Sequence, residues 1–454
     1  MEVAVLDVAD VIERQRLGGR QWLIVFLCAL VMLLDGFDTQ AISYAAPKIA
    51  MQWHLTPDVL GSIFSAGLVG LMIGYLVVAP LSARLGHKRM LLASTAVFAL
   101  FTALTVAASG VGELIALRIL TGIGLGAAAP SAVSLACEYT PTRVRATSVL
   151  LVYSGFSLGF VVAGFASGEL IPRYGWTSLM LCGAIAPVLL FLPIALWLPE
   201  SLLSLQKSAN GDARIHNELR RLFPRMDDLG NAIFRSSERA ETRAGVASLF
   251  SQGRLVGTLV LWLVFAVNLA EFYFMQSWLP KMLTDLKYSG ETVVWITALP
   301  MIAGVIAAAP LGVAMDRIGP FVTLSALYGV GALSMWLVGG AFTPNIAWLA
   351  VTVFLAGFCI SGGQKSVIGL AAVFYPQSLR SIGVGWALGM GRLGGIAGPL
   401  LAGTLYAEHW TPGEIFALSS GPVMVAALFV AALGYYYRRT RSKPPYVSAS
   451  ARAL

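Results

Sequence analysis

The feature that most constrains this chain is a series of twelve long apolar runs, each bounded by charged or turn residues. They lie at about residues 21–48, 58–81, 90–110, 112–136, 146–170, 176–198, 254–280, 291–315, 320–341, 345–373, 380–406 and 413–437. A helix needs about 20 mostly apolar residues to cross the hydrocarbon core of a bilayer. Every run reaches that length, so the sequence predicts an all-α integral membrane protein with twelve transmembrane helices.

The overall composition excludes a water-soluble fold. Of 454 residues, 57% are hydrophobic and 12% are charged, whereas soluble domains carry roughly 25% charged residues. The net charge of +8 would suggest nucleic acid as a partner for a soluble protein. In a membrane protein, basic residues collect in cytoplasmic loops. We therefore expect a lipid bilayer as surroundings and no nucleic-acid partner.

One long polar connection divides the runs six and six. The predicted domains are an N-terminal bundle with its cytoplasmic tail (1–199), a central cytoplasmic loop (200–253), a C-terminal bundle (254–437) and a cytoplasmic tail (438–454). The central loop is charged, and we interpret it as a linker or a small amphipathic element on the membrane surface.

The distribution of basic residues predicts the orientation. Tails and loops on the side of both termini hold 24 Lys and Arg residues, and the loops on the opposite side hold four. Because Lys and Arg are retained on the cytoplasmic side, we expect both termini in the cytoplasm and the protein, a monomer, in the inner membrane.

The two halves of the chain also repeat. At an offset of 233 residues Asp38 matches Glu271 and Arg84 matches Arg317, and at an offset of 235 Arg145 matches Arg380. Parallel repeats of six helices are typical of transporters whose substrate binds between the halves, near the middle of the bilayer.

Acidic residues inside the apolar runs are candidates for function, because each costs at least about 2.5–3.5 kcal/mol at mid-bilayer. Asp35 and Asp38 are three residues apart and share one helix face. Burial and mutual repulsion favour proton uptake by at least one of them, which predicts proton coupling or substrate binding. A structural ion pair with Arg118 is the alternative. Glu271 in the seventh run either shares these roles or only packs between helices.

Three cations lie in the same apolar environment, namely Arg118, Arg392 and Lys365. The planar guanidinium of Arg matches a carboxylate, either of a substrate or of the protein itself, and both alternatives stay open for Arg118 and Arg392. Lys365, next to Gln364, either contacts substrate or extends its ammonium group toward an interface.

Motifs of other function classes are missing. The four cysteines and four histidines have no metal-binding spacing, and no nucleophile–base arrangement is visible. Gly389-x-Gly391-x-x-Gly394 has the spacing of a dinucleotide fingerprint, but no strand precedes it, so we interpret these glycines as sites of close helix contact. We expect no enzyme, no cofactor and no metal.

Several motifs together resemble those of the major facilitator superfamily. Gly312 with Asp316-Arg317-Ile318-Gly319 matches its loop between helices eight and nine. The first-half loop keeps Arg84, Gly86 and Lys88, although Ala79 and Ala83 replace the usual Gly and Asp. Asp35-Gly36-Phe37-Asp38-Thr39-Gln40, Glu138-Tyr139-x-Pro141 and Gly383 to Arg392 are similar to signatures of its aromatic acid:proton symporters.

The resemblance implies a proton-driven importer of an aromatic carboxylate, such as a benzoate or hydroxybenzoate, that works by alternating access. Proton coupling is then expected at Asp35, Asp38 and Glu271. The expected substrate-binding residues are Arg118, Arg392, Phe37, Gln40, Tyr273, Gln364, Lys365 and Trp386, and Phe37, Tyr273 and Trp386 are those expected to stack on its ring. The expected cytoplasmic gating residues are Arg84, Glu138, Arg145, Asp316, Arg317 and Arg380.

Two other functions remain as alternatives. One is a carrier of the same superfamily for another small organic acid, a sugar or a drug. The other is a membrane sensor of aromatic acids without transport, although the central loop and the tail are short for an output domain.

Overall fold

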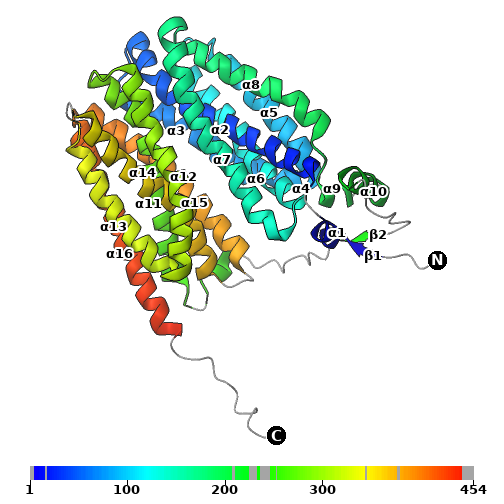
Figure 1. Cartoon of the computed structure of the whole chain (residues 1–454). Coiled ribbons are helices and arrows are strands. Elements are labelled where there is room, and N and C mark those ends of the chain that lie inside the picture. The colour runs from blue at the N-terminus through cyan, green and yellow to red at the C-terminus, as the bar shows by residue number, and fades with distance from the viewer. Residues whose placement is uncertain are drawn as a thin grey trace.

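The computed structural model is almost entirely helical (Figure 1). It describes residues 5–15, 18–206, 210–223, 233–235, 246–251, 253–342, 345–375 and 379–441. The long helices of this part are α2 (Gly19–Trp53), α3 (Pro57–Ile73), α5 (His87–Thr105), α6 (Val111–Glu138), α7 (Thr142–Tyr174), α8 (Trp176–Trp197), α11 (Leu255–Asp285), α12 (Gly290–Arg317), α13 (Pro320–Gly339), α14 (Ile346–Phe374), α15 (Arg380–Ala407) and α16 (Pro412–Arg441). The shorter elements are β1 (Val5–Asp7), α1 (Val8–Arg14), η1 (Gly74–Val78), η2 (Ala79–Leu81), α4 (Ser82–Leu85), α9 (Leu202–Gln206), α10 (Gly211–Leu222), β2 (Ile233–Arg235) and η3 (Val246–Leu249).

Each predicted apolar run corresponds to one long helix, which confirms the predicted fold class. The second run forms α3 and continues through the π-helical turn η1 and the 3₁₀ turn η2. In the described part, eleven helical segments are long and apolar enough to cross a membrane. The twelfth, α15, is as long as its neighbours, but its eight glycines and Arg392 lower its hydropathy.

Several helices begin at side chains that cap their free N–H groups. Ser289 accepts a hydrogen bond from the backbone N–H of Thr292 at the start of α12 (3.3 Å), and Asn345 accepts one from Trp348 at the start of α14 (3.1 Å). Thr411 and Glu414 form a reciprocal capping box before α16. These polar residues interrupt the apolar sequence and so define where neighbouring spans are separated.

The helices of each half pack in the same pattern. Before the central segment, α2 lies along α7, α5 packs on α8, and α6 packs on both α3 and α5. After it, α11 lies along α15, α13 packs on α16, and α14 packs on both α12 and α13. The repeat that is visible in the sequence therefore extends to the packing. In Figure 1 the first six long helices and the last six form two neighbouring bundles.

The two bundles contact each other mainly through α3 with α15, α7 with α12 and α2 with α11. We call the end that carries both termini and the central segment the terminal end, and the opposite end the distal end (Figure 1). Ser65 donates a hydrogen bond to the carbonyl of Ile396 (2.8 Å), and the hydroxyls of Tyr44 and Thr297 are hydrogen bonded to each other. Tyr44, Thr297 and Ile396 lie in the distal halves of their helices and Ser65 lies at the middle of α3, so these contacts hold the bundles together from the middle toward the distal end.

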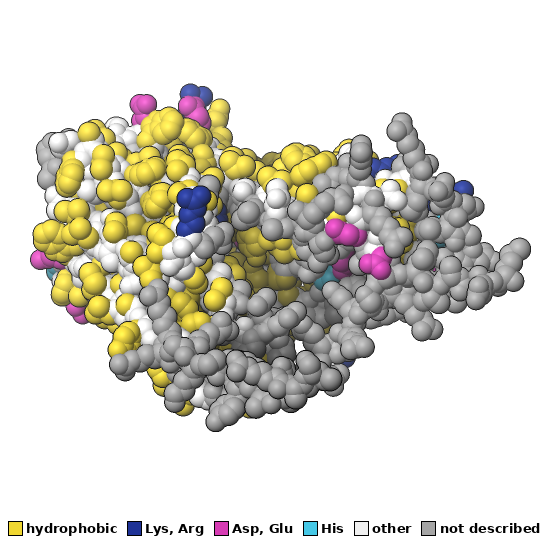
Figure 2. All heavy atoms as spheres, turned by 60° about the horizontal axis from the view of Figure 1, so that its bottom comes forward, with side chains coloured by type: hydrophobic (Ala, Val, Ile, Leu, Met, Phe, Trp, Pro, Cys, Tyr) yellow, Lys and Arg dark blue, Asp and Glu magenta, His cyan; other side chains and the backbone are white. Residues whose placement is uncertain are grey.

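The outer surface of the helices is apolar. Large hydrophobic side chains such as Leu189, Leu196, Val256 and Leu401 are exposed, and Figure 2 shows hydrophobic side chains over much of the flank of the molecule. Figure 2 also shows the surface hollowed between the bundles toward the terminal end. An apolar exterior of this extent fits helices that face lipid.

The central segment contains the helix α10, which has one apolar and one polar face. In α10, Ile215, Leu219 and Leu222 are buried, while its arginines are exposed. The sequence did not predict that β2 of this segment pairs in parallel with β1 near the N-terminus. Each strand has three residues, which is too short for an alternating pattern to be recognised.

Candidate functional site

A bidentate ion pair lies in the centre of the first bundle. Arg118 of α6 donates hydrogen bonds from Nη1 and Nη2 to the two carboxylate oxygens of Asp38 in α2, at 3.1 and 2.8 Å. Both side chains are almost fully buried, with 4% and 1% of their surface exposed. Thr102 of α5 adds a hydrogen bond to Asp38 (3.3 Å). The structure thus forms the Asp–Arg118 pair that the sequence left open, and forms it with Asp38.

Asp35 lies one helical turn earlier and is also buried, with 3% of its surface exposed. It shares a side-chain hydrogen bond with Thr39, and its Oδ1 has no hydrogen-bond partner among the described residues. Arg392 of the opposite bundle is within electrostatic range. Asp35 is therefore a buried carboxylate that faces the second bundle and is only partly satisfied.

Gly36, between these two carboxylates in the sequence, lets α2 pack closely on α7. A Cβ atom at this position would lie 2.0 Å from the carbonyl oxygen of Phe156 in α7. The missing side chain lets the α7 backbone pack directly on α2.

Arg392 is the central cation of the second bundle. Its Nη1 donates a hydrogen bond to the hydroxyl of Tyr273 in α11 (2.9 Å), and its guanidinium lies over the ring of Tyr75 from the first bundle, 4.9 Å from the ring centroid. The close packing of α15 on α11 positions it, since a Cβ at Gly394 would lie 1.9 Å from the carbonyl oxygen of Ala266. Arg392 has two aromatic neighbours and no bidentate carboxylate partner in the described part.

A small cavity is lined by one residue of each of these two groups, Arg118 and Tyr273. Its volume is about 20 Å³, which is room for about one water molecule. The cavity is lined by Thr39, Ile42, Phe64, Gly67, Leu68, Leu71, Arg118, Gly122, Leu125, Tyr273 and Ser277. Both bundles contribute to it, so it lies at the predicted interface between the repeats.

Gln40 also joins the bundles, because its Nε2 donates a hydrogen bond to the backbone carbonyl of Gln276 (3.2 Å). Glu271 occupies the place that the repeat assigns to Asp38, but it faces a different neighbour. It is buried and shares a side-chain hydrogen bond with Ser419 of α16. Glu271 therefore lies inside the second bundle rather than at its interface with the first.

Four further residues expected in the site do not line the small cavity. Phe37 is buried, and its ring lies 3.2 Å from a Cβ built at Gly183 of α8. Trp386 is 44% exposed and stacks on Trp262 at 5.9 Å between ring centroids. Gln364 and Lys365 are half-buried in α14.

The expected gating residues lie at helix ends near the terminal end. Glu138, at the end of α6, accepts hydrogen bonds from the Ser201 hydroxyl (2.9 Å) and the Leu202 N–H (2.8 Å), and lies 3.6 Å from His87. Arg84 and Arg317 are exposed. The side chains of three others, Arg145, Asp316 and Arg380, lie outside the described residues.

Sequence reasoning missed Tyr75 and Thr102. Tyr75 lies in the π-helical turn η1, where Gly74 packs against the backbone of α6. Such turns often occur at functional sites, but the sequence shows only a tyrosine inside an apolar run. Thr102 likewise gives no signal, because threonine is common in transmembrane helices.

Buried charges that meet between two repeated six-helix bundles are the architecture of a carrier with a central site. The sequence matches the family model described as Major Facilitator Superfamily over residues 28–294 and 261–453. It is 36% identical over 430 residues to a 4-hydroxybenzoate transporter of Pseudomonas putida (94% of this chain, 96% of that protein). It is 37% identical over 442 residues to a gallate transporter of Pseudomonas putida (97% of each chain).

Solved structures agree with the fold. An inward-open conformation of the xylose transporter XylE from E. coli superimposes with a TM-score of 0.71 at 17% identity, covering 90% of this chain and 95% of the other. The chain belongs to the major facilitator superfamily, in the family that includes these transporters of aromatic acids. It is thus a multi-pass membrane transporter, and the resemblance noted in the sequence is confirmed.

Proposed function

We propose that this protein imports an aromatic carboxylate together with protons across the inner membrane. The observation that carries the proposal is the position of Arg392, which lies between Tyr273 and Tyr75 and within range of the buried Asp35. A cation, two aromatic rings and an incompletely paired carboxylate form one cluster between the bundles. The relatives named for 4-hydroxybenzoate and gallate support an aromatic acid as the substrate class.

Arg392 is the better anchor for the substrate carboxylate of the two buried arginines. Arg118 already holds Asp38 through two hydrogen bonds, so a substrate would have to displace a buried carboxylate to reach its Nη atoms. Arg392 holds only a neutral tyrosine hydroxyl. The rings of Tyr75 and Tyr273 provide apolar faces beside it on which an aromatic substrate packs.

Asp35 carries the proton in this proposal. With Asp35 ionised, Arg392 has a protein anion nearby. When Asp35 takes a proton, that anion disappears and Arg392 is free to bind the anion of the substrate. The net charge of the cluster is then the same in the loaded and the empty carrier, which keeps the cost of reorienting it inside the membrane low. Deprotonation of Asp35 returns the competing charge and releases the substrate.

Alternating access uses the two predicted domains, 1–199 and 254–437, as the moving bodies. The distal end is closed by contacts such as Tyr44 with Thr297, and the cavity at the site has room for about one water. Substrate binding therefore needs the bundles to separate around the cluster. Arg84, Glu138, Arg145, Asp316, Arg317 and Arg380, near the terminal end, are the proposed latch of the opposite conformation.

The terminal end faces the cytoplasm in this proposal. Its loops and tails carry 24 Lys and Arg residues, against four in the loops of the distal end, and this asymmetry orients multi-pass proteins. The conformation described here is then closed to the outside, and substrate leaves toward the cytoplasm.

Uptake by proteoliposomes tests the proposal. Purified protein is reconstituted, and accumulation of labelled 4-hydroxybenzoate is measured with and without an imposed pH gradient, acid outside. We expect the gradient to drive accumulation. Asp35→Asn, which is permanently neutral, should lose gradient-driven accumulation while keeping exchange of labelled for unlabelled substrate. Asp58→Asn is the matched control, because Asp58 is exposed at the distal start of α3.

Two results would contradict the proposal. Equal uptake with and without the imposed pH gradient would exclude proton coupling. Accumulation by Asp35→Asn equal to that of the Asp58→Asn control excludes Asp35 as the proton carrier.

A further inference from the structure

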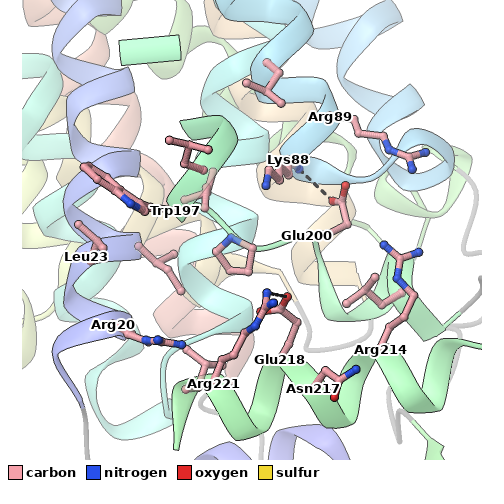
Figure 3. Close-up of a pocket in the computed structure, with 17 residues that line it drawn as sticks. Arg20, Leu23, Lys88, Arg89, Trp197, Glu200, Arg214, Asn217, Glu218 and Arg221 are labelled. Atoms are coloured by element: carbon pink, nitrogen blue, oxygen red, sulfur yellow. Dashed lines mark hydrogen bonds and ion pairs between the residues drawn. The ribbon is translucent and has the colours of Figure 1, made fainter. Parts of the chain in front are cut away.

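A second and much larger pocket lies at the terminal end of the first bundle, away from the central cluster. Its volume is about 840 Å³. The walls are the start of α2, the start of α5, the end of α8 and the amphipathic helix α10, which faces these three helix ends across the pocket (Figure 3). Since α2, α5 and α8 are long and apolar enough to cross a membrane, we expect the pocket at their ends to lie near the membrane–water interface.

The pocket is strongly cationic. Five basic residues line it: Arg20, Lys88, Arg89, Arg214 and Arg221. Two carboxylates, Glu200 and Glu218, also line the pocket, so the lining carries a net charge of +3. Figure 3 shows the basic groups coming from α2, α5 and α10 and surrounding one space.

Hydrogen bonds within the wall already occupy both carboxylates. Glu200 accepts hydrogen bonds from the backbone N–H groups of Lys88 (3.0 Å) and Ser201 (2.9 Å). Glu218 accepts one from Arg221 of its own helix at 3.3 Å. Figure 3 draws the contacts of Lys88 with Glu200 and of Arg221 with Glu218 as dashed lines. Neither acid neutralises the other arginines of the pocket.

Three arginines remain without an acceptor in the described part of the chain. Arg20, Arg89 and Arg214 are exposed, and no hydrogen bond or ion pair of their side chains occurs there. Like charges around one space repel each other, and an anion between them lowers that repulsion. Arg20 lies in the first turn of α2, and Lys88 and Arg89 lie in the first turn of α5, so the positive ends of two helix dipoles add to this charge.

The remaining wall of the pocket is apolar and continues onto the lipid-facing surface. Leu23 and Leu92 line it beside Leu196 and Trp197 at the end of α8. Leu196 is 65% exposed and Trp197 is 59% exposed. A soluble anion has no apolar part that could pack against this wall. A phospholipid has both parts, since its phosphate fits the arginines and its acyl chains lie along the apolar side chains.

We propose that this pocket binds the phosphate headgroup of an anionic phospholipid of the same leaflet and thereby holds α10 against the ends of α2, α5 and α8. The lipid contributes negative charge to a pocket whose lining carries a net charge of +3. This site is independent of the transport substrate, and its test does not require transport.

Binding of lipid to the purified full-length protein tests the proposal. The protein is delipidated in detergent and titrated with phosphatidylglycerol or phosphatidylcholine, and retained lipid is counted by native mass spectrometry. We expect retention of phosphatidylglycerol in clear excess over phosphatidylcholine. The double variant Arg89→Gln/Arg214→Gln should bind phosphatidylglycerol roughly tenfold or more weakly, because it lacks two of the charges that attract the headgroup.

Two controls make the test specific. Arg220→Gln removes an exposed arginine of the same helix that does not line the pocket, and it should bind phosphatidylglycerol like the unaltered protein. Inorganic phosphate at millimolar concentration should not displace the lipid.

Three outcomes would overturn the proposal. The first is equal retention of the two lipids, and the second is unaltered binding by the Arg89→Gln/Arg214→Gln variant. The third is displacement by inorganic phosphate, which would make the pocket a site for soluble phosphate compounds.

Discussion

Asp38 and Arg118 form a two-pronged ion pair in the middle of the first bundle, with hydrogen bonds of 3.1 and 2.8 Å and almost no exposed surface. Both terminal nitrogens of Arg118 donate hydrogen bonds within this pair. The pair thereby distinguishes the two neighbouring aspartates, because Arg118 binds both carboxylate oxygens of Asp38, whereas Oδ1 of Asp35 has no hydrogen-bond partner in the described part of the chain.

Breaking this pair should destabilise the protein strongly. Arg118→Gln leaves Asp38 buried without a counter-charge, and we expect a loss of about 3–5 kcal/mol in the free energy of unfolding. The double variant Asp38→Asn/Arg118→Gln should lose clearly less free energy of unfolding than the sum of the losses in the single variants Asp38→Asn and Arg118→Gln. Denaturant unfolding in detergent measures both.

The control for that comparison is Arg173→Gln. Arg173 pairs with Glu169 at 2.9 Å, but both side chains are about 70% exposed, so the loss should be about 0–1 kcal/mol. Simple additivity of the two single losses at Asp38 and Arg118 would show that the residues act independently.

Removing the Tyr273 hydroxyl should weaken substrate binding. Tyr273→Phe keeps the ring but deletes the hydrogen bond that holds Arg392 (2.9 Å). A hydrogen bond of this kind contributes about 0.5–1.5 kcal/mol, so KM for uptake should rise roughly two- to tenfold. Initial uptake rates over a range of substrate concentrations measure it.

Tyr406→Phe is the matched control, since its hydroxyl donates to Asp285 at the distal end, 2.8 Å away, outside the site. An unchanged KM in Tyr273→Phe would show that the orientation of Arg392 does not depend on this contact.

A disulfide across the closed distal end should arrest transport. A Cβ at Gly168 of α7 would lie 3.4 Å from Cγ2 of Val294 in α12, which is close enough for cysteines at both positions to bond. The pair is introduced after replacement of Cys28, Cys137, Cys182 and Cys359. Oxidation should abolish uptake and reduction should restore it, because the distal end must open in each cycle.

Each single cysteine variant provides the control, and its uptake should not respond to oxidant. Full uptake by the oxidised double variant, with the disulfide verified by mass spectrometry, would show that the contact of α7 with α12 persists through the cycle.

Gly36 should not tolerate a methyl group. Gly36→Ala places a Cβ 2.0 Å from the carbonyl oxygen of Phe156, so α2 and α7 have to separate. We expect a large drop in the yield of folded protein by size-exclusion chromatography. At Gly112, in contrast, a Cβ meets no atom within 4 Å, and Gly112→Ala should behave like the parent. Equal yields of the two variants would contradict the packing described here.

Much of the fold followed from the sequence because lipid imposes a simple rule. Every span needs an apolar run of sufficient length, and the bilayer accepts few other structures. The runs therefore predicted all the long helices within a few residues. They did not predict the pairing of β1 with β2, because three-residue strands leave no recognisable pattern.

The candidate site was predictable as a set of residues but not as an arrangement. Burial of charge is costly, so Asp35, Asp38, Arg118 and Arg392 were conspicuous in apolar runs. Nothing in the sequence indicated that Glu271 faces Ser419 within its own bundle.

Only the tertiary structure decided which residues the buried arginines contact. The sequence by itself determined how many helices span the membrane and which charges lie among them, because these depend on the length and polarity of single segments. Which aspartate Arg118 holds depends on how closely α2, α6 and α7 approach one another. That Tyr75 meets Arg392 depends on a helical turn and on contact between residues 317 positions apart. Such distances are set by packing between segments, which the pattern of any one segment does not record.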